Sequence, residues 1–160
     1  MRYSLRAIAG AITISLLGIA PATQAASNSA NFDVSIQVNA TCAISAGNMT
    51  FSSITTGTTS NTDATSTLTV NCSNGTPYTI SMGNGNNYSG GRRMTNGTAN
   101  INYYLYSDSS RSTPWTQTAT QTGTGNGSDQ SLTIYGRVPS GQSVTNTGAY
   151  ADTIVATITY

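Results

Sequence analysis

Apolar and polar residues alternate along several short stretches of this chain, as in strands that bury one face and expose the other. Clusters of Gly, Asn and Ser separate these stretches, and no stretch after residue 25 has the period of an amphipathic helix. The alternation predicts strands over residues 32–39, 68–72, 78–82, 101–106, 132–138 and 154–160. Short strands at this spacing, with Thr on the polar faces, predict an all-β sandwich.

Two of the predicted strands lie at the ends of the chain. The first runs over residues 32–39, and the last runs over residues 154–160 without a charge, a Pro or a Gly. Exposed sheet edges usually carry such residues, because an unprotected edge pairs with other chains. Two interpretations are open: the end strands pair with another chain, or both are buried strands of a closed sandwich.

The N-terminus has the pattern of a secretory signal peptide. Arg2 and Arg6 lead into an apolar run that ends at Ala20, and small residues follow it. The run is too short to span a bilayer comfortably. We expect removal of residues 1–25, with cleavage one residue later or three residues earlier as alternatives, and one soluble domain in the remainder.

The charged residues of the chain exclude most kinds of catalysis. The chain has no His, Lys or Glu, which removes the usual Ser and Cys triads, the Schiff-base lysine and the imidazole ligands of metals. Its five Asp residues lack the arrangement of a glycosidase pair or a calcium loop. We therefore expect no enzyme, no metal and no cofactor. A net charge of +1 also gives no basic surface for nucleic acid.

Two local features have simple interpretations. The adjacent Arg92 and Arg93 are expected in a solvated loop. The Gly- and Asn-rich stretches 83–86 and 123–127 lead into no helix, so we expect turns there rather than phosphate-binding loops.

The two cysteines, Cys42 and Cys72, both follow the predicted signal peptide. An even number of cysteines in an exported protein predicts a disulfide, and only one pairing within the chain exists. On the chain-entropy model, closing a loop of about 30 residues stabilises the fold by about 3–4 kcal/mol.

Three motifs follow one another in the second half of the chain. They are Tyr104-Leu105-Tyr106-Ser107-Asp108 with Arg111 and Trp115, then Tyr135-Gly136-Arg137-Val138-Pro139-Ser140-Gly141-Gln142, and then Gly148-Ala149-Tyr150-Ala151-Asp152-Thr153. In this order they resemble the spore coat protein U domain, a family that includes subunits of archaic (Csu-type) chaperone–usher pili. The likeness extends from Phe32 to Tyr160.

The resemblance implies an immunoglobulin-like sandwich at residues 40–160 that lacks its last strand, preceded by a donor segment at residues 26–39. In such families a periplasmic chaperone fills the gap, and an outer-membrane usher then replaces it with the N-terminal strand of the next subunit. The implied donor residues are Phe32, Val34, Ile36 and Val38. The implied wall of the acceptor groove, which is also the contact with the chaperone, consists of Ile154, Ala156, Ile158 and Tyr160.

The resemblance thus implies a structural pilus subunit that is exported through the periplasm to the cell surface and supports adhesion and biofilm formation. The implied partners are the chaperone, the usher and related pilin subunits in a head-to-tail polymer, without nucleic acid or membrane insertion. Two alternatives stay open. One is a spore-coat or matrix protein of the same family, and the other is a binding module that grips a sugar or an abiotic surface through Tyr88, Tyr104, Tyr106 or Trp115.

Overall fold

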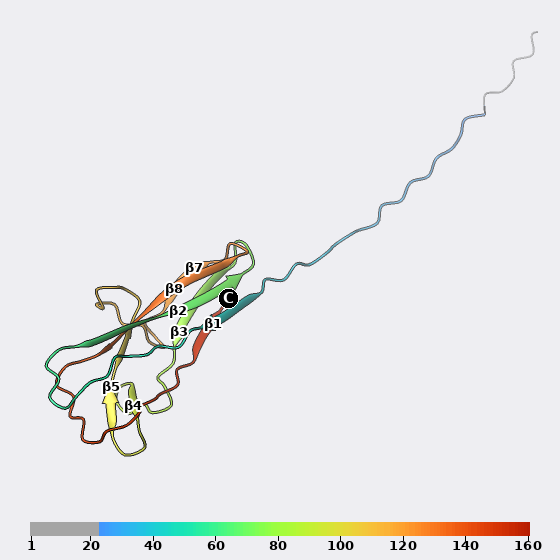
Figure 1. Cartoon of the computed structure of the whole chain (residues 1–160). Helices are drawn as coiled ribbons and strands as arrows, with labels where there is room; N and C mark the ends of the chain where they lie inside the picture. Colours follow the sequence, from blue (N-terminus) through green and yellow to red (C-terminus); the bar gives the residue numbers. More distant parts are fainter. Residues whose placement is uncertain (1–22) are drawn as a thin grey trace, which may run out of the picture. The chain divides into compact units, whose positions relative to one another are not determined.

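The computed structural model describes residues 23–160, which form nine β-strands (Figure 1). Most of the predicted signal peptide, residues 1–25, lies outside the described residues. None of the described residues belongs to a helix long and apolar enough to cross a membrane. The contacts divide the chain into two units between Ile36 and Gln37. Residues 23–41 form no strand, so the alternating segment at 32–39 has no ladder with the rest of the described chain.

The larger sheet has four antiparallel strands. In spatial order they are β1 (Cys42–Ala46), β2 (Thr62–Cys72), β8 (Asp129–Val138) and β6 (Tyr104–Tyr106). The long strands β2 and β8 pair along almost their whole length and form the centre of the sheet. The short strands β1 and β6 are therefore its two edges.

The second sheet has three antiparallel strands. In spatial order they are β7 (Gln121–Thr124), β3 (Pro77–Met82) and β9 (Ala156–Thr159). A separate hairpin joins β4 (Arg93–Thr95) to β5 (Asn100–Asn102). A bridge between Thr95 and Ala151 connects this hairpin to the segment that leads into β9.

One hydrophobic core lies between the two larger sheets, and the predicted all-β sandwich is confirmed. Leu68 and Val70 of β2 share a buried cluster with Ile134 of β8 and with Ile80 and Met82 of β3. Alternate residues enter this core because successive side chains of a strand point to opposite faces. Burying a large apolar side chain contributes roughly 1.5–3 kcal/mol, so these positions supply much of the stability.

The predicted disulfide between Cys42 and Cys72 is present, with a Cα–Cα distance of 4.1 Å. The two residues are also directly paired in the ladder between β1 and β2. Just before Cys42, the main-chain oxygen of Thr41 accepts a hydrogen bond from the N–H of Ser73 at 2.9 Å. These contacts fix the first residue of β1 to the last residue of β2.

The predicted strand at 101–106 is two strands in different sheets. Its inward face is as predicted, because Ile101, Tyr103 and Leu105 are all buried. The N–H of Tyr103 still donates to the main-chain oxygen of Arg92 at 3.1 Å, next to the last pair of the β4–β5 ladder, and from Tyr104 on the chain pairs with β8 instead. One alternating stretch therefore supplies both β5 of the hairpin and the edge strand β6.

Two further boundaries differ from the prediction. Gly123 and Thr124 belong to β7 rather than to a turn, and a side chain at Gly123 would collide with the ring of Tyr78 on β3. The last strand covers only Ala156–Thr159. Alternation alone also does not separate β1 from the segment that precedes it, since the apolar period runs through both.

The prediction that Arg92 lies in a solvated loop is wrong. Its side chain is only 7% exposed, and its guanidinium donates to the main-chain oxygens of Met82, Gly83 and Trp115, each at 2.8 Å. Burial lowers the pKa of this guanidinium, and the three carbonyl oxygens compensate for the lost water. Arg93 makes one such contact, to a loop carbonyl at 2.7 Å.

Candidate groove between two sheet edges

The edge strands β1 and β9 come close to each other on one side of the sandwich. Within residues 37–160, β1 has a ladder only with β2, and β9 has a ladder only with β3. Each strand therefore presents one row of main-chain N–H and C=O groups that no neighbouring strand pairs in this unit. An extended segment can add to a sheet at such edges.

A groove of about 540 Å³ lies where β1 ends and β9 begins. Its lining combines apolar side chains with polar groups and comes from several separate parts of the chain. The central lining residues are Met49, Phe51, Met82, Met94, Leu105 and Ile134. A volume of this size lies in the range of ligand sites, and its chemistry suits apolar side chains.

The floor of the groove depends on the absence of a side chain at Gly136 of β8. A Cβ atom there would collide with Sδ of Met49 and would lie 2.9 Å from the ring of Phe51. Both residues belong to the irregular segment that follows β1. Gly136 therefore lets this segment pack directly on the sheet.

The C-terminal residues form one side of the groove. Ile154, Ala156 and Ile158 are half-buried and pack against the core, and the first two line the groove. Val155 points the other way and is 64% exposed. Tyr160 is 59% exposed and is not among the residues that line the groove.

A polar cluster closes one end of the groove around Asp152. Its carboxylate accepts hydrogen bonds from the hydroxyl of Tyr103 at 2.6 Å and from the main-chain and side-chain N–H groups of Asn87 at 3.1 and 3.0 Å. The pKa of the Tyr103 phenol is raised mainly by burial and further by the hydrogen bond to Asp152. The phenol therefore keeps its proton and stays a donor. The cluster ties the segment before β9 to the loop after β3.

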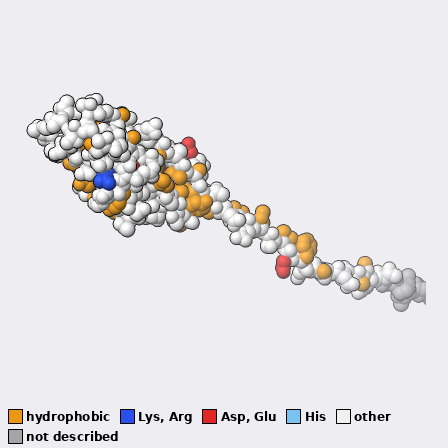
Figure 2. All heavy atoms as spheres, turned by 90° about the horizontal axis from the view of Figure 1, so that it is seen from below, with side chains coloured by type: hydrophobic (Ala, Val, Ile, Leu, Met, Phe, Trp, Pro, Cys, Tyr) orange, Lys and Arg blue, Asp and Glu red, His pale blue; other side chains and the backbone are white. Residues whose placement is uncertain are grey.

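The four predicted donor residues are all exposed. The exposed fractions of Phe32, Val34, Ile36 and Val38 are 84, 82, 90 and 86%, and polar residues stand between them. Figure 2 shows hydrophobic side chains at the surface of the extended N-terminal segment. Large apolar side chains in a regular row are rarely left in water unless a partner covers them. The segment has the length and period of one strand that buries a single face.

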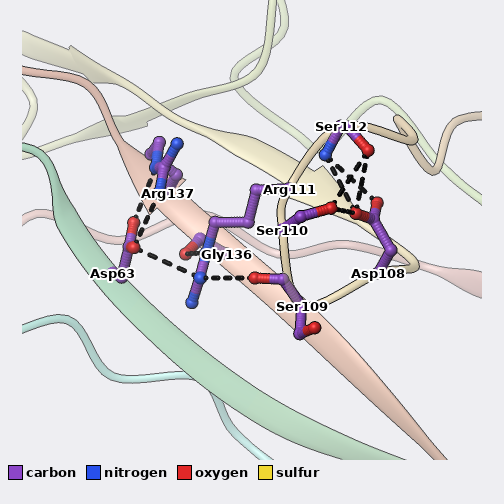
Figure 3. Close-up of polar contacts among 8 residues, drawn as sticks. All are labelled: Asp63, Asp108, Ser109, Ser110, Arg111, Ser112, Gly136 and Arg137. Atoms are coloured by element: carbon purple, nitrogen blue, oxygen red, sulfur yellow. Dashed lines mark hydrogen bonds and ion pairs between the residues drawn. The ribbon is translucent and has the colours of Figure 1, made fainter.

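Residues of the first motif build a structured loop instead of a ligand site (Figure 3). The carboxylate of Asp108 accepts hydrogen bonds from the main-chain N–H groups of Ser112, at 3.1 Å, and of Thr113, at 2.6 Å. The side chain of Ser110 donates to the same carboxylate. These hydrogen bonds, that of Ser110 above all, hold the pKa of Asp108 well below its usual value.

Arg111 connects this loop to the larger sheet. Its guanidinium lies 3.2 Å from the carboxylate of Asp63 and donates to the main-chain oxygen of Gly136 at 3.1 Å (Figure 3). It also lies over the ring of Tyr135. Its backbone has a φ of 55°, which is unusual for a residue with a side chain. Three simultaneous contacts compensate for that conformation. Arg137 completes the ion-pair network with Asp63 at 2.7 Å.

Trp115 belongs to the core, so the prediction that it could grip a ligand is wrong. It is 1% exposed, and its indole N–H donates to the main-chain oxygen of Ile80 at 3.0 Å. Tyr88 and Tyr104 are each about half exposed, at 49% and 50%. The ring of Tyr106 lies 6.5 Å from that of Tyr104.

The remaining motif residues shape the route into β9. Gly148 has a φ of 133°, and the hydroxyl of Tyr150 donates to the main-chain oxygen of Asn146 at 2.7 Å. Tyr150 also lines the groove. Pro139 follows β8 directly, where a residue without an N–H ends the ladder. The motifs therefore position the walls of the groove, and sequence reasoning did not identify Met49, Phe51 or Tyr103 as part of it.

Residues 23–160 contain no cluster of three or more His, Cys, Asp or Glu side chains that could hold a metal ion. The aspartates are dispersed. Asp63, Asp108 and Asp152 each bind protein donors, as described above, and Asp129 accepts from the side-chain amide of Asn71 at 2.7 Å.

Comparison with known sequences identifies one domain family and one curated relative. The Spore Coat Protein U domain matches residues 28–157. Protein U of Myxococcus xanthus is 38% identical over 73 residues, which are 43% of this chain and 40% of that protein. The chain thus spans less than half the length of this relative.

Comparison with solved structures shows the fold. The chain is similar to one chain in the CsuC–CsuE chaperone–tip adhesion subunit pre-assembly complex from the archaic chaperone–usher Csu pili of Acinetobacter baumannii. The TM-score is 0.60 with 21% identity, and the match covers 77% of this chain and 40% of that chain. This likeness confirms the predicted immunoglobulin-like sandwich.

Proposed function

The chain belongs to the Spore Coat Protein U domain family, and we propose that it is a structural subunit of a chaperone–usher surface pilus. The similar solved structure comes from a complex of a chaperone with a subunit of chaperone–usher pili, which supports the proposal. On this proposal the chain is exported through the periplasm to the cell surface. It contributes to adhesion and biofilm formation as a non-catalytic building block.

The mechanism that we propose is the exchange of strands between copies. The exposed row of Phe32, Val34, Ile36 and Val38 from one subunit enters the groove beside β9 of the next. The observation that carries the proposal is that one chain contains both an unpaired strand sequence with an apolar face and a groove, lined in part by apolar side chains, between two unpaired sheet edges. In this state residues 40–160 are a sandwich without its last strand.

The energetics suit such an exchange. An inserted strand makes main-chain hydrogen bonds to β1 and β9, and its alternate side chains fill the groove. Burying four large apolar side chains contributes roughly 6–10 kcal/mol from area alone. The exchange needs no cofactor. Because each copy gives a strand at one end and accepts one at the other, the contact is heterologous and produces an open filament.

We propose two partners besides further copies of related subunits. A periplasmic chaperone covers the groove of the free subunit by contacting Ile154, Ala156 and Ile158. An outer-membrane usher is the site where the next subunit's segment replaces the chaperone. A spore-coat or matrix role, which the likeness to Protein U favours, is the alternative. Genes for a chaperone and a large outer-membrane usher beside the gene for this chain would favour the pilus.

The experiment that tests the proposal removes residues 26–39. We expect the shortened chain to bind the chaperone but to form no fibres, as judged by electron microscopy of cells that also express the usher. Normal fibres from this chain would refute the assignment of the donor segment. A finer test compares Ile36→Asn with Ser35→Asn. The first substitution changes the apolar face of the segment and should block assembly, whereas the second changes its polar face and should not.

A further inference from the structure

Three methionines follow the predicted signal peptide, and all three line the groove. Met49 lies in the segment after β1, Met82 ends β3, and Met94 lies in β4. Met82 is 1% exposed, whereas Met49 and Met94 are half-buried. Met49 and Met94 are therefore the two methionines of the groove that are partly exposed to small solutes.

We propose that Met49 and Met94 form an oxidative modification site whose state decides whether the groove accepts a strand. The reactant is a peroxide such as hydrogen peroxide. A sulfur lone pair attacks one peroxide oxygen, the S–O bond forms as the O–O bond breaks, and proton transfer releases water. The sulfur loses two electrons and the peroxide gains them, which leaves a sulfoxide. This inference rests on the proposed function of the groove.

Sulfoxide formation changes the groove from adaptable and apolar to polar. An unoxidised thioether is flexible and polarisable, so it fills irregular space against apolar side chains. A sulfoxide oxygen needs a hydrogen-bond donor, and the apolar face of the segment at residues 32–38 has none to offer. At Met49 there is also little room, because its sulfur already occupies the space that a Cβ at Gly136 would need.

Two polar side chains of the groove lining do not supply this donor. The hydroxyl of Ser66 donates to the main-chain oxygen of Gly47 at 2.6 Å. The carboxylate of Asp152 is an acceptor and already receives the hydroxyl of Tyr103 and the amide of Asn87. A sulfoxide oxygen therefore relies on water or on the remaining polar side chains of the lining, and a strand that fills the groove displaces this water.

A strand in the groove covers the same thioethers. Oxidation then acts on the free subunit and not on the assembled one. Met82 provides an internal reference, since it lies in the same groove but is buried in the free domain as well.

The test measures oxidation and strand binding on the same preparation of the monomeric exported chain. Graded hydrogen peroxide is followed by peptide mapping, which reports the gain of one oxygen at each methionine. A fluorescent synthetic peptide with the sequence of residues 30–39 then reports strand binding by anisotropy. We expect Met49 and Met94 to oxidise before Met82, and the dissociation constant of the peptide to rise at least ~10-fold.

Variants separate this effect from general damage. For the double variant Met49→Leu/Met94→Leu, the dissociation constant of the peptide after peroxide treatment should equal the one measured for the same variant before treatment. Met49→Gln, which carries a permanent polar group, should weaken peptide binding without peroxide while the near-ultraviolet circular dichroism remains that of a folded chain.

Each outcome is decisive. Equal peptide binding before and after oxidation of Met49 and Met94 overturns this inference alone, and so does an equal loss in the double Leu variant. Oxidation of Met82 at the same rate as Met49 overturns the assigned accessibility. If the unoxidised chain does not bind the peptide, the proposed function fails and this inference fails with it.

Discussion

Arg92 and Trp115 form a linked pair of buried side chains. Nη1 of Arg92 donates to the main-chain oxygen of Trp115 at 2.8 Å, and the indole N–H of Trp115 donates to the main-chain oxygen of Ile80 at 3.0 Å. Through these bonds the loop before β4 and the segment after β6 are both attached to β3. The guanidinium is a structural link inside the fold, and it provides the first prediction.

Arg92→Ala should lower the free energy of unfolding by about 3–5 kcal/mol, because it leaves three main-chain oxygens without donors and opens a cavity. Urea denaturation of the monomeric chain measures this loss. The neighbouring Arg93→Ala removes one hydrogen bond and should cost about 1 kcal/mol or less. Equal losses in the two variants would contradict the structural role of Arg92.

Gly136→Ala should destabilise the domain by about 1–3 kcal/mol, because the added methyl group displaces Met49 and Phe51 from the floor of the groove. Thermal unfolding followed by circular dichroism measures the effect. Gly91→Ala is the matched control, since no atom lies within 4 Å of a Cβ at Gly91 and its backbone φ is not positive. A control that loses as much as Gly136→Ala would rule out the packing explanation.

Acid should weaken the ion-pair network around Asp63. The hydrogen bond from Arg137, above all, and the charge of Arg111 hold the pKa of Asp63 below its usual 3.8. Since this pKa is lower in the folded chain than in the unfolded one, the stabilisation is complete above about pH 4 and disappears as the pH falls through the folded value.

Asp63→Asn isolates this contribution. The side chain of Asp63 is 35% exposed, so solvent screens the ion pair and we expect the variant to lose only about 0.5–1 kcal/mol at pH 7. The difference from the unmodified chain should shrink below pH 4 in urea titrations at several pH values. Asp108, whose pKa is also lowered, titrates in the same acid range in both proteins and cancels from the comparison. A difference that is constant down to pH 2 would contradict the ion-pair explanation.

Ile158→Asp should prevent recovery of soluble subunit with the chaperone, because it places a charge on the half-buried face of β9. Thr157→Asp changes the adjacent exposed position of the same strand and is the control. Co-purification of the chaperone with each variant measures the outcome. If Ile158→Asp retained the yield of the control, the terminal strand would not be the chaperone's contact.

Loss of the disulfide should lower the free energy of unfolding by about 3–4 kcal/mol on the chain-entropy model. Cys42→Ser/Cys72→Ser and reduction of the unmodified chain should give the same loss in denaturant titrations. An unchanged transition midpoint would argue that the bridge contributes nothing to the monomer.

The alternation of apolar and polar residues predicted most of the sandwich, because a strand that buries one face needs an apolar residue at every second position. The inward residues Leu68, Val70, Ile80 and Ile134 were all identifiable in this way. The division of residues 101–106 into two strands was not, because the change of partner from β4 to β8 after Tyr103 leaves the alternation intact.

The groove was less predictable than the fold. Its wall at Ile154 and Ala156 follows from alternation, but its floor comes from Met49 and Phe51, which lie in an irregular segment without periodicity. Only the three-dimensional packing on Gly136 brings them there. The position of Arg92 was also not predictable from the sequence. A charged residue in a Gly-rich stretch predicts a solvated loop, whereas the main-chain oxygens that accept hydrogen bonds from its guanidinium come together only in the folded chain.

The bridge between Cys42 and Cys72 also determines how the domain bears tension. A pull on the N-terminal segment reaches Cys42 first, and the covalent bond transfers the load directly to the end of β2. Residues 43–71 are bypassed, so β1 cannot be peeled from the edge of the sheet. This bypassed loop contains all of β1 except Cys42 and all of β2 except Cys72. As long as the bridge is intact, tension along the N-terminal segment therefore leaves the pairing of β1 with β2 unloaded.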